Sequence, residues 1–556
     1  MVRTLLITLC AVVGVFGGCH HRNGPPTWSK SYTVRGYLSI PYAELKEDFL
    51  AWFDASSGSS RVDYYGGMVK TYQLSNKGSF GSMLKIAPVT TETQLNVPTC
   101  LQVNGTKDEK VKPQDMLPDL TNFQCSGTEV VNGVECEKWT LKEQVGEKMN
   151  MYTMWLRWKK SPKSPKLARA VPVQYEMKGY NTLLGSHYDH YYLQYDMFSF
   201  DVPSLDVFKI NDNMTCTHFP GPGIKHLATF NPMKEFIHNE DRHIDHAWTN
   251  FKDSMMKTYD NDTEHDRRKI VFKHNFRFIN TVNRANRGYQ LAINHLADKT
   301  DDEIQALRGK LRSTNPVHNG GQKFPYSKEE IKHILKDAPD NFDWRLYGAV
   351  TPVKDQSVCG SCWSFGTTGT IEGAYFLKTG HLVRLSQQAL IDCSWGFGNN
   401  GCDGGEDFRS YQWMMKHGGL PLESDYGNYL GQDGNCHVDK TPLTAKITGF
   451  VNVKNNDEDA LKVALFKHGP ISVAIDAAHK TFSFYSNGVY YEPECKNTPE
   501  GLDHSVLAVG YGTLNGKKYW LVKNSWSNLW GNDGYVLMST KDNNCGVMTT
   551  PTYVTM

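Results

Sequence analysis

The chain has 556 residues, too many for one ordinary domain, so we expect about three or four domains. Hydrophobic residues make up 39% of the sequence, a globular composition that excludes wholesale disorder. Sixty basic and 59 acidic side chains leave a formal net charge of +1. A chain so close to neutral has no overall field to attract nucleic acid or an anionic membrane, so we expect a local site to select its partners.

The only long apolar run lies at the start of the sequence, from Leu5 to Phe16, behind Arg3 and ahead of small residues that end at Cys19. This pattern is typical of a secretory signal, which we place at residues 1–19. A membrane anchor is the alternative, but a membrane-spanning helix needs about 20 apolar residues. The signal predicts a secreted, endolysosomal or granule protein without a membrane span, in which three sequons can carry glycans, at Asn104, Asn213 and Asn261.

Residues 20–225 predict an antiparallel β domain, because large apolar side chains alternate along two stretches. Asn-Gly pairs at 104–105 and 132–133 predict hairpin turns. The basic stretch at 159–169, which two prolines interrupt, predicts a solvated loop. The alternating residues are Tyr152, Met154, Leu156 and Trp158 in the first stretch, and Tyr191, Leu193, Tyr195 and Met197 in the second.

These strands resemble ependymin-related proteins, and the resemblance implies a curved half-barrel that holds an apolar ligand. A packed core is the alternative explanation for the aromatic stripes. The domain also has an even set of cysteines whose pairing the sequence leaves open, Cys100, Cys125, Cys136 and Cys216.

Beyond this domain, six residues at steps of three or four positions lie on one face of a predicted helix. They are Glu264, Arg268, Phe272, Asn275, Ile279 and Asn283. Together with Asn294, Leu296 and Asp298 they resemble the inhibitory propeptide of cathepsin L-like cysteine proteases, with leucine in place of the usual phenylalanine at 296. The resemblance implies a propeptide at residues 240–308 that inhibits the chain's own protease domain, which would make the chain a zymogen.

Two segments flank the core of this propeptide. Three histidines, His238, His243 and His246, suggest a metal site, but no carboxylate-plus-histidine set with zinc spacing surrounds them. We therefore predict a solvated helix start there, with no metal and no cofactor. Residues 309–337 are rich in Gly, Asn, Pro and Lys and predict an exposed linker that holds the activating cleavage.

Seven of the thirteen cysteines lie beyond residue 350, so at least one thiol there lacks a partner in that region. Cys359 and Cys362 have the Cys-x-x-Cys spacing of thiol-disulfide exchange proteins. However, His504 begins a predicted buried strand and Asn524 follows another apolar run. Cysteine, histidine and asparagine thus occur in the order needed for a thiol nucleophile, its proton partner and a group that orients the histidine.

His504 lies 142 residues after Cys362, and Asn524 lies 162 residues after it. With these spacings, the segment from Gln356 to Trp363 resembles the papain family of cysteine proteases, in its cathepsin L-like group. The resemblance implies an α+β domain at residues 338–556 with a helical lobe and a β-barrel-like lobe. It also implies an endopeptidase that hydrolyses peptide bonds through a thioester acyl-enzyme. Two serines depart from the family pattern, because glycine is usual at positions 357 and 527.

Each catalytic candidate suits this chemistry. Cys362 precedes a predicted helix at 363–378, whose dipole, with a neighbouring imidazolium, would favour the thiolate before substrate arrives. His504 would protonate the departing amine, and Asn524 would fix the ring, with Trp526 covering their bond. Gln356 would donate to the oxyanion together with the backbone N–H of Cys362.

The resemblance further implies three disulfides, Cys359–Cys402, Cys393–Cys436 and Cys495–Cys545, so that Cys362 stays free. It places Gly404 and Gly405 along the groove, where missing side chains let an extended substrate backbone pair with the protein. It implies that Asp407, Ala474, Leu502 and Thr550 line the pocket for the residue two before the cleaved bond. We expect this pocket to accept apolar side chains and, through Asp407, arginine.

The domain order also resembles insect haemocyte cysteine proteases, which are processed into two unequal chains. Two alternatives to an active protease remain. In the first alternative, the chain is a ligand-binding or adhesive β module with a vestigial protease domain. The presence of all four catalytic candidates disfavours this alternative. In the second, it is a disulfide oxidoreductase, which pairing of Cys359 with Cys402 would exclude.

Overall fold

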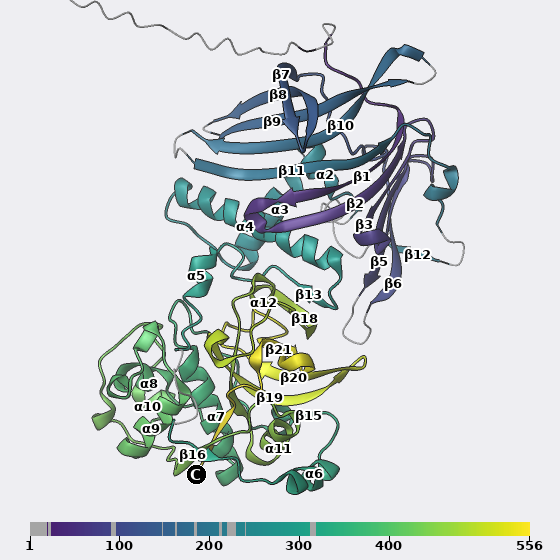
Figure 1. Cartoon of the computed structure of the whole chain (residues 1–556). Helices are drawn as coiled ribbons and strands as arrows, with labels where there is room; N and C mark the ends of the chain where they lie inside the picture. Colours follow the sequence, from purple (N-terminus) through teal and green to yellow (C-terminus); the bar gives the residue numbers. More distant parts are fainter. Residues whose placement is uncertain are drawn as a thin grey trace, which may run out of the picture. The chain divides into compact units, whose positions relative to one another are not determined.

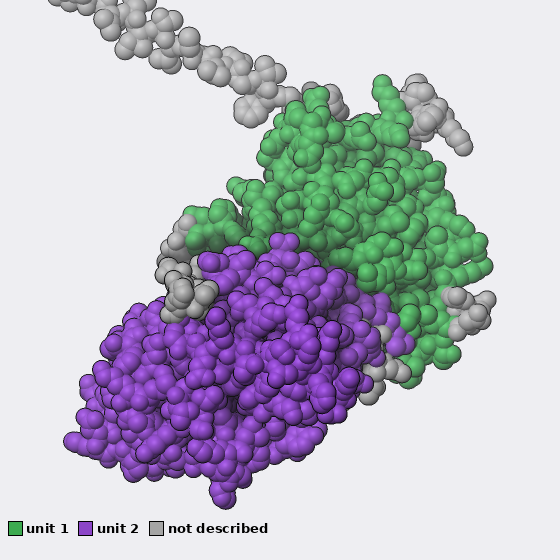
Figure 2. All heavy atoms as spheres, turned by 60° about the horizontal axis from the view of Figure 1, so that its bottom comes forward, with its two compact units in different colours: residues 1–87, 98–247 green, residues 88–97, 248–556 purple. Residues whose placement is uncertain are grey.

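The computed structural model describes residues 19, 24–89, 96–146, 148–161, 164–182, 186–210, 214–218, 230–239, 241–311 and 319–556. The predicted signal, apart from Cys19, lies outside these residues. The chain divides into two compact units, residues 1–87 with 98–247, and residues 88–97 with 248–556 (Figure 2). In the described part of the chain, no helix is both long and apolar enough to cross a membrane.

The first unit is built on one sheet with the strand order β12-β6-β5-β4-β3-β2-β1-β11-β10-β9-β8-β7 (Figure 1). The ladders β1–β2, β2–β3, β3–β4, β4–β5 and β7 to β11 are antiparallel, as predicted, and so is β1 with β11, whereas β12 runs parallel to β6. The order is linear, so the sheet stays open, and Figure 1 shows it curved. The strands are β1 (Ser31–Ile40), β2 (Leu45–Asp54), β3 (Ser59–Tyr64), β4 (Val69–Leu74), β5 (Ser82–Val89), β6 (Val97–Asn104), β7 (Gln124–Val131), β8 (Val134–Val145), β9 (Lys148–Ser161), β10 (Ser164–Asn181), β11 (Ser186–Ser199) and β12 (Cys216–His218).

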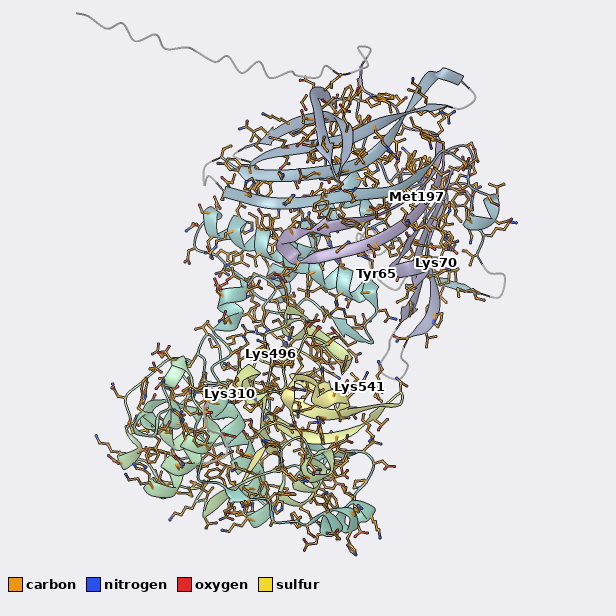
Figure 3. All side chains as sticks on the ribbon, viewed as in Figure 1. Tyr65, Lys70, Met197, Lys310, Lys496 and Lys541 are labelled. Atoms are coloured by element: carbon orange, nitrogen blue, oxygen red, sulfur yellow. A yellow bond between two sulfur atoms is a disulfide. The ribbon has the colours of Figure 1, made fainter. Side chains whose placement is uncertain are left out.

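Alternation explains which sheet face is buried. In β9 and β11, Tyr152, Met154, Leu156, Tyr191 and Leu193 are all buried in one cluster, since every second side chain points to the same face. The last residue of the second predicted stripe, at position 197, is 36% exposed (Figure 3). The alternating residues therefore form a packed core.

Two hairpin predictions had different outcomes. Asn132 and Gly133 join β7 to β8 with φ values of 50° and 77°, the left-handed backbone that a two-residue hairpin needs. The pair at 104–105 is not a hairpin: a loop follows β6, and the N–H of Gly105 donates to the carbonyl of Gly81. The predicted solvated loop at 159–169 is also wrong, because β9 extends to Ser161 and β10 begins at Ser164.

Among the described residues this unit has five cysteines, which cannot all pair with each other. Cys19 pairs with Cys125, Cys100 pairs with Cys216, and Cys136 is free and buried. A signal that ended after residue 19 would remove one half of the first disulfide. The signal boundary at residue 19 stays a prediction, because residues 1–18 lie outside the described residues.

The second unit combines helices with a sheet in the order β13-β18-β21-β20-β19-β17-β22-β16-β14, in which β15 pairs with β19 (Figure 1). This path is linear, so the β-barrel-like lobe does not close within the described residues. Its strands are β13 (Tyr289–Leu291), β14 (Gln322–Lys323), β15 (Phe342–Asp343), β16 (Gly449–Asn452), β17 (Ile471–Ile475), β18 (Tyr485–Tyr490), β19 (His504–Leu514), β20 (Lys517–Lys523), β21 (Tyr535–Ser539) and β22 (Thr552–Thr555).

Two helices decide where the site lies. Helix α7 (Cys362–Thr379) confirms the predicted helix and ends at Gly380, whose φ of 75° suits a left-handed cap. Its Gly369 packs against Leu507 of β19, where a Cβ would meet the leucine side chain at 2.6 Å. This close approach places the N-terminus of α7 beside the start of β19.

Helix α4 (Asp262–Ala285) confirms the second predicted helix. Asn261 caps its start by accepting from the N–H of Glu264 at 3.0 Å. The other helices are α2 (Met233–His238), α3 (Arg242–Ser254), α5 (Asp301–Gln305), α6 (Lys328–Asp337), α8 (Gln387–Cys393), α9 (Asp407–His417), α10 (Glu423–Tyr426), α11 (Glu458–His468) and α12 (Lys480–Ser483). Part of the predicted exposed linker thus folds as β14 and α6.

Candidate active site

Three catalytic candidates meet where α7, β19 and β20 come together. The sulfur of Cys362, the first residue of α7, accepts from the backbone N–H of Ser505 at 3.4 Å. His504 is the neighbour of Ser505 and begins β19, while Asn524 directly follows β20, the antiparallel partner of β19. The helix and the two strands therefore bring together residues that lie far apart in the sequence.

Hydrogen bonds determine the role of each ring nitrogen. Oδ1 of Asn524 accepts from the backbone N–H of Ser525 at 2.8 Å and lies 2.8 Å from Nε2 of His504. Because this oxygen can only accept, Nε2 carries the proton, and Nδ1 is left as an acceptor for the thiol proton. Among the described residues Nδ1 has no hydrogen-bond partner. Trp526 covers the histidine, with 4.8 Å between ring centroids, and is itself buried.

Gln356 is oriented in the same way. Its Oε1 accepts from the hydroxyl of Ser525 at 2.7 Å, which turns Nε2 toward the carbonyl oxygens of Leu307 and Cys359, both at 2.8 Å. Leu307 belongs to the predicted propeptide. A propeptide carbonyl thus accepts the hydrogen bond that Gln356 was expected to offer to an oxyanion.

The same segment covers the nucleophile. The backbone of Gly309 acts on the thiol of Cys362 and lowers its pKa, against the effect of burial. A Cβ on Gly309 would overlap the carbonyl oxygen of Gly360, so only glycine fits this close contact. Lys310 then forms a parallel bridge with Gly405, and the N–H of Gly405 donates to the carbonyl of Gly309. Gly405 has no side chain that could block this pairing.

Burial sets the charge state of the covered pair. It raises the pKa of the Cys362 thiol to about 11 and lowers the pKa of His504 to about 4. Both groups are therefore neutral near pH 7. This differs from the expected thiolate, because burial disfavours the charged form of both groups.

Helix α4 is joined to later parts of the propeptide, and the strand after it pairs with the protease domain. Arg268 donates to Glu264 and Glu303, while Asn275 donates to the carbonyl of Ala297 at 2.9 Å. Asn283 exchanges hydrogen bonds with the backbone of Leu291, the last residue of β13. Strand β13 pairs with β18, and the side-chain amide of the predicted residue Asn294 donates to Ser483. The predicted helical face therefore organises the segment that enters the groove.

The residues predicted for the substrate pocket are not equivalent. Asp407 and Thr550 line one cavity of about 440 Å³. Ala474 and Leu502 are buried and do not line this cavity. The Oδ2 atom of Asp407 accepts from the hydroxyls of Ser472 at 2.9 Å and Thr552 at 2.6 Å, so it is already partly engaged.

Glycine and serine backbones shape the rims of the site. Gly404 has a φ of 118°, and a Cβ there would meet the carbonyl oxygen of Gly309 at 2.7 Å. Ser357 and Ser527, at the two positions where glycine is usual, have φ values of 56° and 65°. This left-handed backbone costs about 1–2 kcal/mol for a residue with a Cβ, which gives the usual glycine a physical reason.

The cysteines of this unit form three disulfides, Cys359–Cys402, Cys393–Cys436 and Cys495–Cys545, and Cys362 is free. These are the pairs that the family resemblance implied. Because Cys359 is bonded to Cys402, it cannot form a redox pair with Cys362, which removes the basis of the oxidoreductase hypothesis.

The histidines ahead of the propeptide do not form a solvated group as predicted. His243 is buried, and its Nε2 lies 3.4 Å from Glu235, whereas His238 and His246 are exposed. In the described parts of the chain, one cluster has metal-ligand geometry, Asp476, His479 and Cys495, but this cysteine is bonded to Cys545.

Sequence reasoning missed the residues that connect propeptide and groove. Leu307 lies within the predicted propeptide but outside its motif residues. Gly309 is the first residue of the predicted linker, whose boundary was placed from composition alone. Glu406, which is buried beside Lys310, directly follows the two predicted groove glycines, and this position is the one signal that pointed to it.

Known proteins share this arrangement. The model of the papain family cysteine proteases matches residues 338–555, and the cathepsin propeptide inhibitor domain (I29) matches residues 248–304. A cathepsin L-like peptidase of Aedes aegypti is 44% identical over 321 residues, which are 56% of this chain and 93% of that protein. Cathepsin L2 of Homo sapiens is 41% identical over 322 residues, with the same two shares.

Solved structures agree with these matches. The digestive procathepsin L2 proteinase of the Tenebrio molitor larval midgut has a TM-score of 0.52 and 34% identity, and the match covers 56% of this chain and 100% of that one. Procathepsin L 3 from the same midgut has a TM-score of 0.50 and 35% identity, with coverage of 56% and 99%. The predicted α+β fold is thereby confirmed. The chain belongs to the papain family of cysteine proteases, in its cathepsin L-like group, and is a zymogen that carries a propeptide inhibitor domain.

Proposed function

We propose that Cys362 is the nucleophile that attacks the peptide carbonyl and forms a thioester acyl-enzyme. His504 takes the thiol proton at Nδ1 and gives it to the departing amine, after which it draws a proton from the water that hydrolyses the thioester. The oxyanion accepts from Nε2 of Gln356 and from the backbone N–H of Cys362. One observation carries this proposal: Asn524 binds the far side of the histidine ring, which leaves Nδ1 for the thiol.

We infer that the propeptide keeps this site off in two ways. It occupies the hydrogen-bond donor of Gln356, and it holds the pair of Cys362 and His504 in a neutral, buried state. Release of the segment 307–311 would return water to the site and allow the thiolate to form. We place the activating cleavage within residues 309–337, of which 312–318 lie outside the described residues.

Processing into two unequal chains and entry into the secretory pathway are further parts of this proposal. Several relatives bear names such as digestive cysteine proteinase, which favours a secreted or lysosomal route for this chain as well. Five disulfides agree with an oxidising compartment. Asn104 and Asn261 are exposed and suit glycosylation, whereas Asn213 lies outside the described residues.

For the residue two before the cleaved bond, we propose a pocket in the cavity that Asp407 and Thr550 line. Ala474 and Leu502, which the family resemblance also implied, are buried in the zymogen and would contribute apolar surface to this pocket only after a local rearrangement. Arginine acceptance through Asp407 is supported by the position of its carboxylate in the cavity, although Ser472 and Thr552 compete for that carboxylate.

The first unit has its own candidate binding site. A cavity of about 1080 Å³ is lined largely by polar and charged residues, many of them from the loop after β6, and Phe53, Met83 and Lys234 also line it. We propose that it accommodates the apolar ligand that the sheet pattern suggested, with its polar end toward the lysine. Binding of a fluorescent fatty acid to the full zymogen, competed by unlabelled fatty acid, is the expected result. A Met83→Lys variant that bound equally well would contradict this placement.

An active-site label tests the protease proposal. The purified zymogen is acidified, an epoxide inhibitor selective for active-site thiols is added, and the labelled residue is located by mass spectrometry. We expect no label at pH 7 in the intact zymogen, since the thiol pKa is about 11, and full labelling of Cys362 with peptide hydrolysis after propeptide removal. Cys136 is the internal control, because it is the other free thiol among the described residues.

Hydrolysis that stays absent after complete propeptide removal would contradict the proposal. That result would favour a ligand-binding or adhesive β module with a vestigial protease domain. A Cys362→Ser variant provides the matched negative control, since the hydroxyl retains the size of the side chain and loses the acidity.

A further inference from the structure

Glu406 is a buried carboxylate that the proposed mechanism does not use. It lies between Gly405 of the groove and the start of α9, and its side chain is 4% exposed. Its Oε1 lies 3.6 Å from Nζ of Lys310, and its Oε2 lies 3.1 Å from Nε of Arg409. Burial raises the pKa of Glu406, and the two cations act in the opposite direction. A buried carboxylate with two cationic neighbours is a strongly charged feature at the edge of a substrate groove.

Only one of these cations belongs to the mature protease domain. Arg409 is on the same helix, donates to the carbonyl of Gly398 and lies over the ring of Phe408. Lys310 comes from the segment 307–311, which runs from the propeptide into the linker, and release of that segment would remove it (Figure 3 labels its position). Among the described residues, Arg409 is then the one cation left that pairs with Glu406.

Lys310 occupies this place through backbone pairing that a substrate can reproduce. Its N–H donates to the carbonyl of Asp503 at 3.1 Å, and its neighbours on either side bond Gly405, at 2.9 and 3.0 Å. The side chain lines the same cavity as Glu406, Asp407 and Phe408, is only 12% exposed, and donates from Nζ to the carbonyl of Leu311 at 3.0 Å. An extended peptide that pairs with Gly405 would send a side chain into the same cavity.

We propose that Glu406 forms a subsite for a lysine or arginine side chain of the peptide substrate, in the place that Lys310 occupies in the zymogen. This inference rests on the proposed function and adds a substrate class to it. The aliphatic stem of the basic residue packs along Phe408, while its charged end replaces Nζ of Lys310 beside Oε1 of Glu406. Leaving this buried carboxylate unpaired is unfavourable, so a peptide that supplies the cation gains affinity.

Peptide hydrolysis by the activated enzyme tests the subsite. Fluorogenic peptides vary one of the three residues before the cleaved bond at a time, as lysine, arginine, glutamine, norleucine or glutamate. At one position we expect kcat/KM to be about tenfold or more higher for lysine or arginine than for glutamine. In Glu406→Gln this ratio should fall to about two or less. Asp403→Asn, which removes an exposed carboxylate three residues earlier, should leave the ratio unchanged.

The outcomes separate the subsite from the reaction itself. Epoxide labelling of Cys362 in Glu406→Gln shows that the variant has folded. No preference for a basic residue at any of the three positions, with norleucine peptides hydrolysed, would overturn the subsite and leave the proposed mechanism standing. A preference that persists in Glu406→Gln but disappears in Asp407→Asn would overturn it in favour of Asp407. Failure to hydrolyse every peptide would contradict the proposed function and the subsite together.

The zymogen offers an independent measurement. Lys310→Met removes the cation and should speed epoxide labelling of Cys362 several-fold, and Glu406→Gln should do the same. The double variant should show little further increase, because the two side chains act through one contact. Independent, multiplying effects would show that Lys310 does not bind through Glu406 and would contradict the proposal.

Discussion

The two units of this protein build their structures from contacts of different range. In the first unit, strands that are neighbours in the sequence pair with each other through most of the sheet, and the β1–β11 ladder is the main distant pairing. In the second unit, Cys362 and Ser505, which is next to His504, are 143 positions apart and meet through their side chain and backbone. Local pattern thus explains the first unit, whereas chemistry in the second depends on distant segments that pack together.

The comparison also separates fold from function. Alternating aromatic residues predict a sheet but no reaction, since any packed core uses them. A thiol, an imidazole and an amide in a fixed order predict a reaction before any strand is located. The matches with the two relatives cover only 56% of the chain.

The largest effect is expected from the oxyanion donor. Gln356→Ala should lower kcat of the activated enzyme about a hundredfold, because one hydrogen bond to the transition state is lost. The rate is measured with a fluorogenic peptide. Gln432→Ala, which changes an exposed glutamine of the same unit, is the control and should leave kcat unchanged. Equal rates for both variants would show that Gln356 does not stabilise the transition state. The second unit would then offer less support for the view that its chemistry depends on distant segments.

A smaller effect is expected in the propeptide. Gly309→Ala should raise the rate of epoxide labelling of Cys362 in the zymogen about tenfold, because the added Cβ overlaps the carbonyl of Gly360 and displaces the segment from the sulfur. Gly396→Ala is the matched control, since no atom lies within 4 Å of its Cβ position. An unchanged labelling rate in Gly309→Ala would mean that the propeptide does not inhibit through this contact.

The smallest effect on catalysis is expected in the first unit. Replacing both Cys100 and Cys216 by alanine should lower the free energy of unfolding of that unit by about 2–5 kcal/mol, because the unfolded chain regains its freedom. Peptide hydrolysis should change less than about twofold, because neither cysteine belongs to the unit with the catalytic residues. Calorimetry and a peptide assay on the same sample make the test. A parallel loss of hydrolysis would break the comparison by showing that the two units are energetically coupled.

The sequence predicted helices, strands and chemistry where local signals were strong. Helix α7 follows from its apolar face and from Gly380, and helix α4 follows from the 3–4 spacing of its six residues. It was wrong where a signal had two physical outcomes. The Asn-Gly pair at 104–105 can form a turn without a hairpin.

Properties that depend on burial were beyond the sequence. His243 lies in a segment that looks solvated, but Glu235 and the surrounding helices enclose it. The helix dipole and an imidazolium predicted a thiolate at Cys362, whereas burial raises the pKa of the thiol to about 11. Part of the linker forms α6 because Ser327 and Glu330 make a capping box, a signal that composition alone obscures.

By itself the sequence determined which side chains are available for catalysis and in which order they occur, because residue type and spacing are properties of the chain alone. Tertiary structure alone decided that Leu307 and Gly309 enter the site, that Glu406 meets Lys310, and that the sulfur is protonated in the zymogen. Contacts, burial and pKa depend on which distant segments pack together. The packing of α7 against β19, with a propeptide segment laid over both, is therefore what converts the motif into a latent enzyme.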